Sequence, residues 1–434
     1  MQKRSRILLV ASAIVAAALG VIFTRNLIDF PVYYSAGQSL ISGRSDLYSP
    51  DFALGQVMDY RYLPFFLLAF IPLWLLPYST ASYIWYLLSI MQIAGSLWSV
   101  REAVSDSRSS NKILIIAVLA LAQYFVMMLH YGNAHLLAVF LLFASLYSAL
   151  KERDVLAAIL LSLSITIKLT PIFVLPYFAL KRKWKFLLLV CVFLIAINIL
   201  PSVYFGFNKN TELLQTWFHN VILDQEFHET NGPINLSLKG QLRRYFSDVD
   251  YSQRVDGDVR YPSINLFSFT PGVTDGLWML SASIFYVFGL ALILQRSRKK
   301  LWPPVGIDET GALTSLELGL MICLMLFIGP LTSKIYFIAL LWPVVSLAAF
   351  AFNNTSASAT FAKRILILIA FMNSVLPLLP GRSVQRLLLV VGADFYVNCL
   401  VAAAIVYALV STRPTFHRQR DGRQIQVLSA AKRP

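Results

Sequence analysis

The sequence predicts an all-α membrane protein with about twelve transmembrane helices. Of its 434 residues, 57% are hydrophobic and only 14% are charged. Soluble domains carry about 25% charged residues, so this chain has too little polar surface to cover water-soluble globules. The same composition excludes disordered and collagen-like chains, and the three cysteines lie inside apolar runs, which indicates no disulfide framework.

Long uncharged runs define most of the predicted helices. A transmembrane helix needs roughly 17 to 25 mostly apolar residues. The clear runs are 7–24, 113–129, 134–150, 186–208, 276–295, 318–333, 335–362, 365–381 and 395–412. Two stretches are ambiguous: residues 62–100 contain three prolines, and residues 155–180 are interrupted by Lys168 and Pro171.

Two threadings of these ambiguous stretches both give twelve helices. In the first, 63–77 crosses the membrane and 155–180 is one long helix. In the second, 63–77 lies at the outer surface, and 155–167 and 169–180 form a short pair. The positive-inside rule favours the second, because it moves the basic residues near 101–112 to the cytoplasmic side. Its short helices require a water-filled recess on the outer side, since unpaired backbone is unstable against lipid.

The chain is predicted to form one transmembrane domain, residues 1–412, with outer loops at about 25–62 and 207–275. The apolar run 7–24 follows a basic start but is longer than the core of a signal peptide, which predicts a retained signal anchor. Residues 413–434 read as a basic cytoplasmic tail. The net charge of +15 is explained by cytoplasmic loops and anionic lipid headgroups rather than by a nucleic-acid partner.

Asp29 is the most informative polar residue, because it lies just past the first predicted helix among apolar and aromatic neighbours. A carboxylate in such a place is desolvated, which favours its neutral form and makes it a better base. The alternative is an interfacial acid with no chemical role.

Lys168 is the second anomaly, a cation inside a strongly apolar region. Ionisable residues in membrane segments are costly, so they indicate function and a partner. In the second threading Lys168 faces the outer recess, where an anionic group such as a lipid phosphate is its natural partner. The alternative is a lysine whose ammonium snorkels to the membrane surface.

The long outer loop carries basic residues between Asn235 and Arg244. Arginine suits phosphate because its planar guanidinium can bind two oxygens at once, although a solvated basic loop has the same composition. The loop also contains Asp248 with Asp250, and Asp256 with Asp258, which are similar to the metal-binding DxD of nucleotide-sugar transferases. That motif needs an α/β sheet, which the chain lacks, so we expect loop acids and no metal.

The remaining polar and aromatic candidates are less specific. His130 and His135 flank a tight turn, and tyrosines such as Tyr33 and Tyr62 lie in or beside the outer loops, where an interfacial aromatic belt competes with stacking on sugar rings. No glycine-rich nucleotide motif, zinc-protease motif or nucleophile-elbow motif is present. We therefore expect no cofactor.

Several spaced motifs together resemble glycosyltransferase family 87, membrane mannosyltransferases of GT-C architecture that use polyprenol-phosphate sugars. The motifs are Asp29 with Tyr33, Gly43 and Tyr48; Tyr60-Arg61-Tyr62-Leu63-Pro64; Ile167-Lys168-Leu169-Thr170-Pro171; and Asn235, Ser237, Gly240 and Arg244. The resemblance implies a GT-C-type fold in a bacterial plasma membrane, with the active site on the outer side.

The resemblance also implies an inverting transfer of a sugar, most often mannose, from a polyprenyl phosphate to a lipid or glycan acceptor in cell-envelope assembly. Asp29 would be the catalytic base, and Lys168 and Arg244 would stabilise the phosphate. One carboxylate is enough, whereas a retaining double displacement needs a second as nucleophile. The expected substrate-binding residues are Tyr33, Arg61, Tyr62, Asn133, His135, Lys168, Asn235, Lys239, Arg243, Arg244 and Lys334.

Two departures from the family pattern concern the identity of the substrates. The family tends to show a Gly-Gln-x-Asn turn where this chain has Gly132-Asn133-Ala134-His135. A tryptophan and a histidine are expected after a late serine, where this chain has Ser333-Lys334-Ile335-Tyr336. Lys334 is thus either an extra substrate contact or a helix-end anchor.

Two other functions fit a polytopic chain of this kind. One is a transporter or flippase for a lipid-linked glycan, but transporters usually contain internal repeats with paired broken helices, and the sequence shows one break, at Lys168–Pro171. The other is a polymerase or ligase that uses undecaprenyl-diphosphate glycans.

Overall fold

The computed structural model describes residues 15, 18–49, 52, 59–104, 110–223, 232–248, 250, 260–297, 309–379 and 381–412. Three predicted features lie wholly or partly outside these residues: the amino-terminal signal anchor, the Asp256 and Asp258 pair, and the basic tail. The described part is helical, and its only β pairing is an isolated bridge between Ser247 and Phe269.

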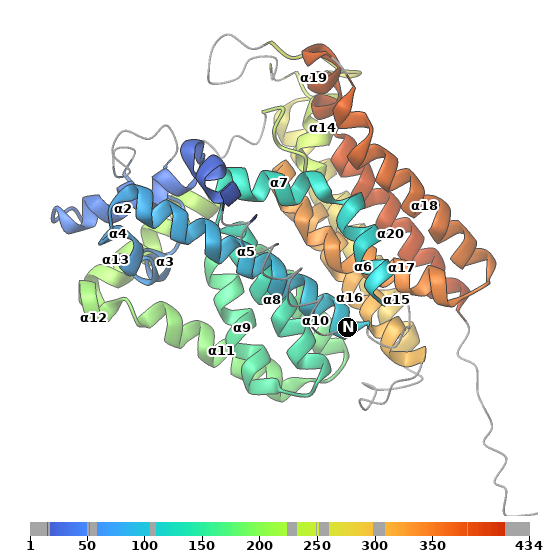
Figure 1. Cartoon of the computed structure of the whole chain (residues 1–434), viewed down its shortest axis with the longest axis horizontal. Coiled ribbons are helices and arrows are strands. Elements are labelled where there is room, and N and C mark those ends of the chain that lie inside the picture. The colour runs from blue at the N-terminus through green and yellow to red at the C-terminus, as the bar shows by residue number, and fades with distance from the viewer. Residues whose placement is uncertain are drawn as a thin grey trace, which may run out of the picture.

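The helices follow one another with short connections (Figure 1). In order they are η1 (Thr24–Asn26), α2 (Phe30–Ile41), α3 (Pro64–Ala69), α4 (Ile71–Trp74), α5 (Tyr78–Ala103), α6 (Ser110–Ala120), α7 (Ala122–Tyr131), α8 (His135–Leu150), α9 (Asp154–Ile167), η2 (Thr170–Val174), α10 (Leu175–Leu180), α11 (Trp184–Ile199), α12 (Ser202–Phe205), α13 (Phe207–Trp217), η3 (Phe218–Leu223), α14 (Leu238–Phe246), α15 (Pro271–Ser297), α16 (Glu309–Ile328), η4 (Lys334–Leu340), α17 (Leu341–Asn353), α18 (Ala357–Ser374), η5 (Leu376–Leu378), α19 (Arg382–Val391) and α20 (Ala393–Ser411).

The described part contains six helical segments long and apolar enough to cross a bilayer. They are Tyr78–Ala103, Trp184–Phe205, Pro271–Arg296, Lys334–Asn353, Ala357–Leu378 and Ala393–Ser411. The pair α6 and α7, bent by 65°, makes a seventh candidate. Shorter apolar helices are His135–Leu150, Asp154–Ile167, Thr170–Leu180 and Ala312–Ile328. The predicted class, an all-α polytopic membrane protein, is confirmed.

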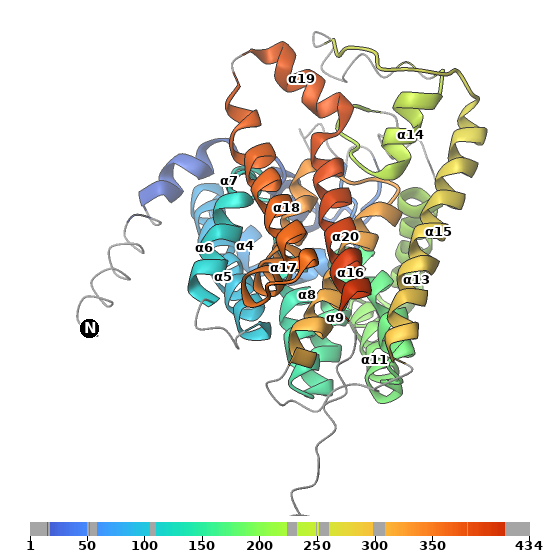
Figure 2. The ribbon, with the colours of Figure 1, turned by 90° about the vertical axis from the view of Figure 1, so that its right-hand side faces the viewer.

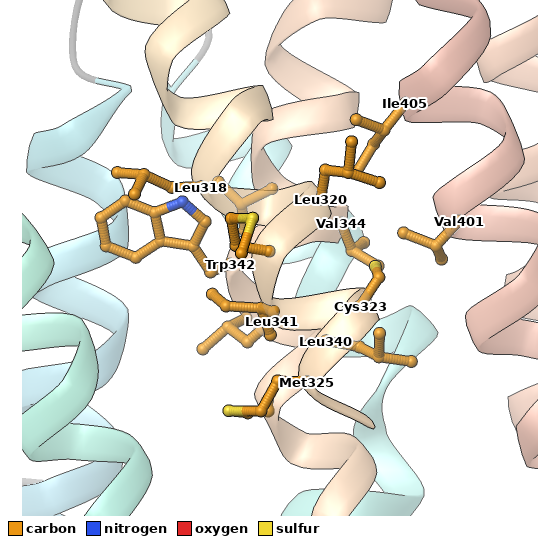
Figure 3. Close-up of a cluster of buried hydrophobic side chains, with 14 of the residues drawn as sticks. Leu318, Leu320, Cys323, Met325, Leu340, Leu341, Trp342, Val344, Val401 and Ile405 are labelled. Atoms are coloured by element: carbon orange, nitrogen blue, oxygen red, sulfur yellow. The ribbon is translucent and has the colours of Figure 1, made fainter. Parts of the chain in front are cut away.

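The helices pack in two groups, which contact each other where η2 packs on α16, α10 packs on α15 and α5 packs on α17. In one group α8 packs on α5 and α9, and α9 packs on α11; in the other α16, α17, α18 and α20 pack together. The segment containing α17 is 89% buried, against 17% for the segment containing α11. Figure 3 shows the side chains around Trp342, whose indole N–H donates to the Ser315 carbonyl at 3.1 Å. The segment containing α17 is thus the most buried of the six candidate membrane segments.

Both ambiguous stretches fold as short helices. α3 and α4 have six and four residues, so at 1.5 Å per residue neither can cross a bilayer of about 30 Å. The stretch 155–180 is broken after Ile167 rather than forming one helix. Pro171 explains the break, because its ring would clash with the carbonyl four residues earlier. These helix lengths agree with the second threading.

The turn between α17 and α18 differs from the sequence prediction. The uncharged runs placed a boundary at Lys363 and Arg364, yet both residues lie inside α18. The helix instead starts after Ser356, whose hydroxyl accepts a hydrogen bond from the Ala359 N–H at 3.2 Å. Lysine and arginine are good helix formers, whereas serine is a favoured N-cap, so local capping decided this boundary.

The long segment after α11 contains helices of its own. α13 and α14 lie within it, and residues 260–270 run extended between α14 and α15. Figure 2 shows α14 and α19 at the same end of the molecule. α7 and α2 lie below this end, towards the middle of the molecule (Figure 1).

Candidate active site

The backbone around Asp29 is fixed by the end of α7. Asp29 immediately precedes α2, and its N–H donates to the Tyr131 carbonyl at 2.9 Å. The last carbonyls of a helix lack partners within the helix, so this hydrogen bond satisfies one of them. It ties the first outer segment to α7.

A tight turn at Gly132 then brings the next residues beneath Asp29. Gly132 has φ 62°, a left-handed conformation that glycine adopts without a Cβ clash. A Cβ atom there would lie 3.1 Å from Leu27 and 3.2 Å from Phe30. The Gly132 carbonyl accepts from the indole N–H of Trp85 at 2.8 Å. The turn is therefore held from two sides.

Asn133 provides the direct contact to the Asp29 carboxylate. Its side-chain N–H donates to Asp29 Oδ2 at 2.9 Å. Burial raises the pKa of the Asp29 carboxyl to about 6, although the Asn133 hydrogen bond and the charge of Lys168 lower it. Asp29 lies outside the candidate membrane segments. A carboxylate with this pKa is ionised near neutral pH and is more basic than a solvated aspartate, which suits a general base.

Lys168 lies at the break after α9 and faces this carboxylate closely enough for its charge to act on Asp29. Its ammonium donates to the Tyr336 hydroxyl and lies 3.8 Å from the centre of the same ring. The structure thus places Lys168 near enough to Asp29 for an electrostatic interaction, and the roles of the two residues in catalysis stay a prediction. It adds Tyr336, to which the sequence analysis gave no role; its place in the late segment that departs from the family pattern was the available signal.

His135 completes this group. Its backbone N–H donates to Asn133 Oδ1 at 2.6 Å, and its ring centre lies 4.4 Å from that of Tyr336. Its exposed fraction is only 3%. Among the described residues neither ring nitrogen has a hydrogen-bond partner, and a buried polar atom without a partner is unusual in a native structure.

Tyr33 and Tyr62 form the aromatic wall beside Asp29. Their hydroxyls lie 2.8 Å apart, and the Tyr33 hydroxyl accepts from the Ala134 N–H at 3.1 Å. Tyr33 is buried, so it supports the turn, while Tyr62 is half-buried. The neighbouring Arg61 is half-buried and offers its carbonyl to the indole N–H of Trp217 at 3.1 Å.

Asn235 and Arg244 lie in a different place from the one predicted. Arg244 is fully buried, and its guanidinium donates to the carbonyls of Val390 at 2.9 Å, Gly232 at 3.1 Å and Asn235 at 2.7 Å. The Asn235 side chain donates to the Pro330 carbonyl at 3.0 Å. Three of the five guanidinium N–H groups therefore bind carbonyls within the fold, and the complete burial of the side chain makes Arg244 a structural arginine.

Three further predicted cations have carboxylate partners. Arg243 binds Asp275 through two hydrogen bonds of 2.9 and 2.7 Å, and Lys239 lies 3.3 Å from the same carboxylate. Lys334 lies 3.8 Å from Asp394, a buried acid on α20. Of the predicted cations, Lys168 thus faces Asp29, while these three pair with acids elsewhere.

No group of three or more potential metal-ligating side chains occurs among the described residues. Asp248 is described, whereas Asp256 and Asp258 are not.

Comparisons with known proteins place the chain in a family. The model of glycosyltransferase family 87 matches residues 60–316. This chain belongs to that family. Among solved structures, ArnT from Cupriavidus metallidurans in the apo state is similar, with 14% sequence identity over 94% of this chain and 77% of that one, and a TM-score of 0.40. No curated protein matches at a significant level.

The family 87 match makes the protein a membrane glycosyltransferase. The matched segment includes Asn133, His135 and Lys168, whereas Asp29 precedes it and Tyr336 follows it. The geometry therefore joins residues from inside and outside the matched segment in one site.

Proposed function

We propose that this family 87 member is an inverting glycosyltransferase that moves mannose from a polyprenyl-phosphate donor to a glycolipid or glycan acceptor of the cell envelope. The observations that carry the proposal are the half-buried Asp29 carboxylate, which accepts a hydrogen bond from Asn133 at 2.9 Å, and the Lys168 ammonium, whose positive charge lowers the pKa of that carboxyl. An acid and a cation held together match the two charges that this reaction develops.

The proposed chemistry needs one base. Asp29 takes the proton from an acceptor hydroxyl while that oxygen attacks the anomeric carbon of the donor. The bond from this carbon to the phosphate oxygen breaks, and its electron pair stays on the phosphate. Asn133 orients the Asp29 carboxylate through its hydrogen bond, and Lys168 stabilises the negative charge that develops on the leaving polyprenyl phosphate.

The proposed orientation puts this site on the outer side of a bacterial plasma membrane. The basic turn Lys181-Arg182-Lys183 connects α10 to α11, and α20 ends just before Arg413. Positive residues beside membrane helices favour the cytoplasm. α2 and α7 lie towards the other end of the molecule (Figure 1).

The decisive experiment replaces Asp29 by asparagine. Purified protein in nanodiscs receives decaprenyl-phosphate mannose and a glycolipid extract from a deletion strain of the native host, and radiolabelled mannose in glycolipid is measured. Asp29→Asn should lower kcat by about 10³-fold, within the range for a lost general base. The matched control is Asp46→Asn, an exposed acid in the same outer segment that pairs with Arg44. Full activity of Asp29→Asn would remove the mechanism.

A further inference from the structure

Tyr336 stands between the two polar side chains that the proposed mechanism leaves incompletely bonded. It is half-buried at the start of the segment η4–α17. On one side its hydroxyl accepts from the Lys168 ammonium, and on the other its ring packs on His135 at 4.4 Å. Tyr336 also interacts electrostatically with Tyr62, which lies beside Asp29.

Lys168, Tyr336 and His135 can form more hydrogen bonds than they make with one another. A phenolic oxygen that accepts from an ammonium keeps its own hydrogen for a further acceptor. The hydrogen bond that the Tyr336 hydroxyl makes with the described residues is the one it accepts from Lys168, and neither ring nitrogen of His135 has a partner among those residues. Three groups that can donate a hydrogen bond therefore gather at one place: the ammonium, the phenol and one nitrogen of the neutral imidazole, whose other nitrogen is an acceptor. Such a group fits an anion with several oxygens, and a phosphate has that chemistry.

We propose that Tyr336 is a catalytic residue whose hydroxyl donates to the phosphate of the donor and stabilises it as the sugar leaves. This inference rests on the proposed function and adds a residue to it. The hydrogen bond from Lys168 polarises the phenolic O–H, and hydrogen bonds in such a chain strengthen one another. A phenylalanine would keep the ring contacts with Lys168 and His135 but would lack this donor.

The charge change of the reaction explains why a neutral donor beside Lys168 is useful. The donor is a phosphodiester with one negative charge. When the bond from the anomeric carbon to the phosphate oxygen breaks, the electron pair remains on that oxygen and the polyprenyl phosphate carries two. The acceptor proton goes to Asp29. Hydrogen bonds that strengthen during this step accelerate it, because they bind the transition state more tightly than the ground state.

The test compares Tyr336→Phe with wild type in nanodiscs, using two pure lipids: decaprenyl phosphate and decaprenol. Tyr336→Phe should weaken decaprenyl phosphate binding about tenfold, as for a lost hydrogen bond to a charged group, and leave decaprenol binding unchanged. In the transfer assay kcat should fall about tenfold or more, while the KM of the donor changes less. The matched control is Tyr286→Phe, which loses a tyrosine hydrogen bond of 2.6 Å to Phe173; it should match wild type in every measurement.

Each outcome separates this inference from the proposed function. Wild-type affinity of Tyr336→Phe for decaprenyl phosphate, or an equal loss for both lipids, would overturn the inference even if Asp29→Asn abolishes transfer. A selective loss of phosphate binding supports the inference even if Asp29→Asn keeps its activity, in which case only the role of Asp29 as base fails.

Discussion

Two clusters of charged side chains, one around α14 and one around Asp29, differ in how their hydrogen-bond donors are used. Around α14, Arg244 donates hydrogen bonds to three carbonyls, and Arg243 forms an ion pair with Asp275. Around Asp29, Lys168 contacts an aromatic ring and a hydroxyl, and His135 has no hydrogen-bond partner for its ring among the described residues. Buried donors that are already satisfied hold a fold together, whereas donors left open are free for a ligand.

The two clusters are also mechanically connected. Asn235 and Ser237 both donate to the Pro330 carbonyl at 3.0 Å, and the Leu236 N–H donates to Thr332 at 2.7 Å. Thr332 lies just before η4, which carries Tyr336. The cluster around α14 thus helps to position the segment that carries Tyr336. Substitutions in the α14 cluster are expected to lower stability, and substitutions around Asp29 are expected to lower the rate of transfer.

The largest stability effect is expected from Arg244→Ala. The change leaves three buried carbonyls without their donor and opens a cavity, which together should cost at least about 3 kcal/mol. Thermal unfolding in detergent measures the loss. The control Arg386→Ala removes a less buried arginine with one long hydrogen bond of 3.4 Å and should change stability by less than about 0.5 kcal/mol.

The same variant can contradict the assignment of Arg244 to a structural role. If Arg244→Ala unfolds at the wild-type temperature but loses affinity for decaprenyl phosphate, then Arg244 contacts phosphate as the sequence suggested. Transfer activity normalised to folded protein should instead remain close to wild type.

The next effect is expected from Lys168→Ala. Removal of the cation from the proposed phosphate site should lower kcat/KM for the donor about 100-fold, the usual range for one electrostatic contact in a transition state. Stability should change little, because Lys168 is half-buried at a helix end. Steady-state kinetics of mannose transfer checks the rate.

Lys209→Ala is the matched control for Lys168→Ala, since Lys209 is a lysine of α13 in a surface pair with Glu212. Surface pairs contribute about 1 kcal/mol or less, so its kinetics should be unchanged. If the kinetics of Lys168→Ala were unchanged, Lys168 would be a lysine that only extends its ammonium to the membrane surface, with no role in transfer.

The smallest effect is the pH dependence. The base must be ionised, and burial raises the pKa of Asp29 to about 6, so activity is lost as the pH falls through this value. The kcat/KM for the donor should rise about tenfold between pH 5 and pH 7 and then level. A pH–rate profile with parallel unfolding measurements checks this. A flat profile over that range would mean that Asp29 is not the titrating base.

Much of the local structure around the site follows from residue type. Pro171 forces the break that exposes Lys168, Gly132 permits the left-handed turn, and apolar runs indicate the helices. The turn before α18 was misplaced, because charge counts ignore the N-cap preference of Ser356. Such local errors shift a boundary without changing the fold class.

The sequence by itself therefore determined the membrane class and the family resemblance, and it singled out Asp29 and Lys168 as candidates, because composition, proline and isolated charges act locally. Only the tertiary structure decided which basic residues remain open for a ligand. A guanidinium near carbonyls and a lysine near a phenol look alike in one dimension, and hydrogen-bond partners distant in sequence, such as Val390 for Arg244 and Tyr336 for Lys168, distinguish them.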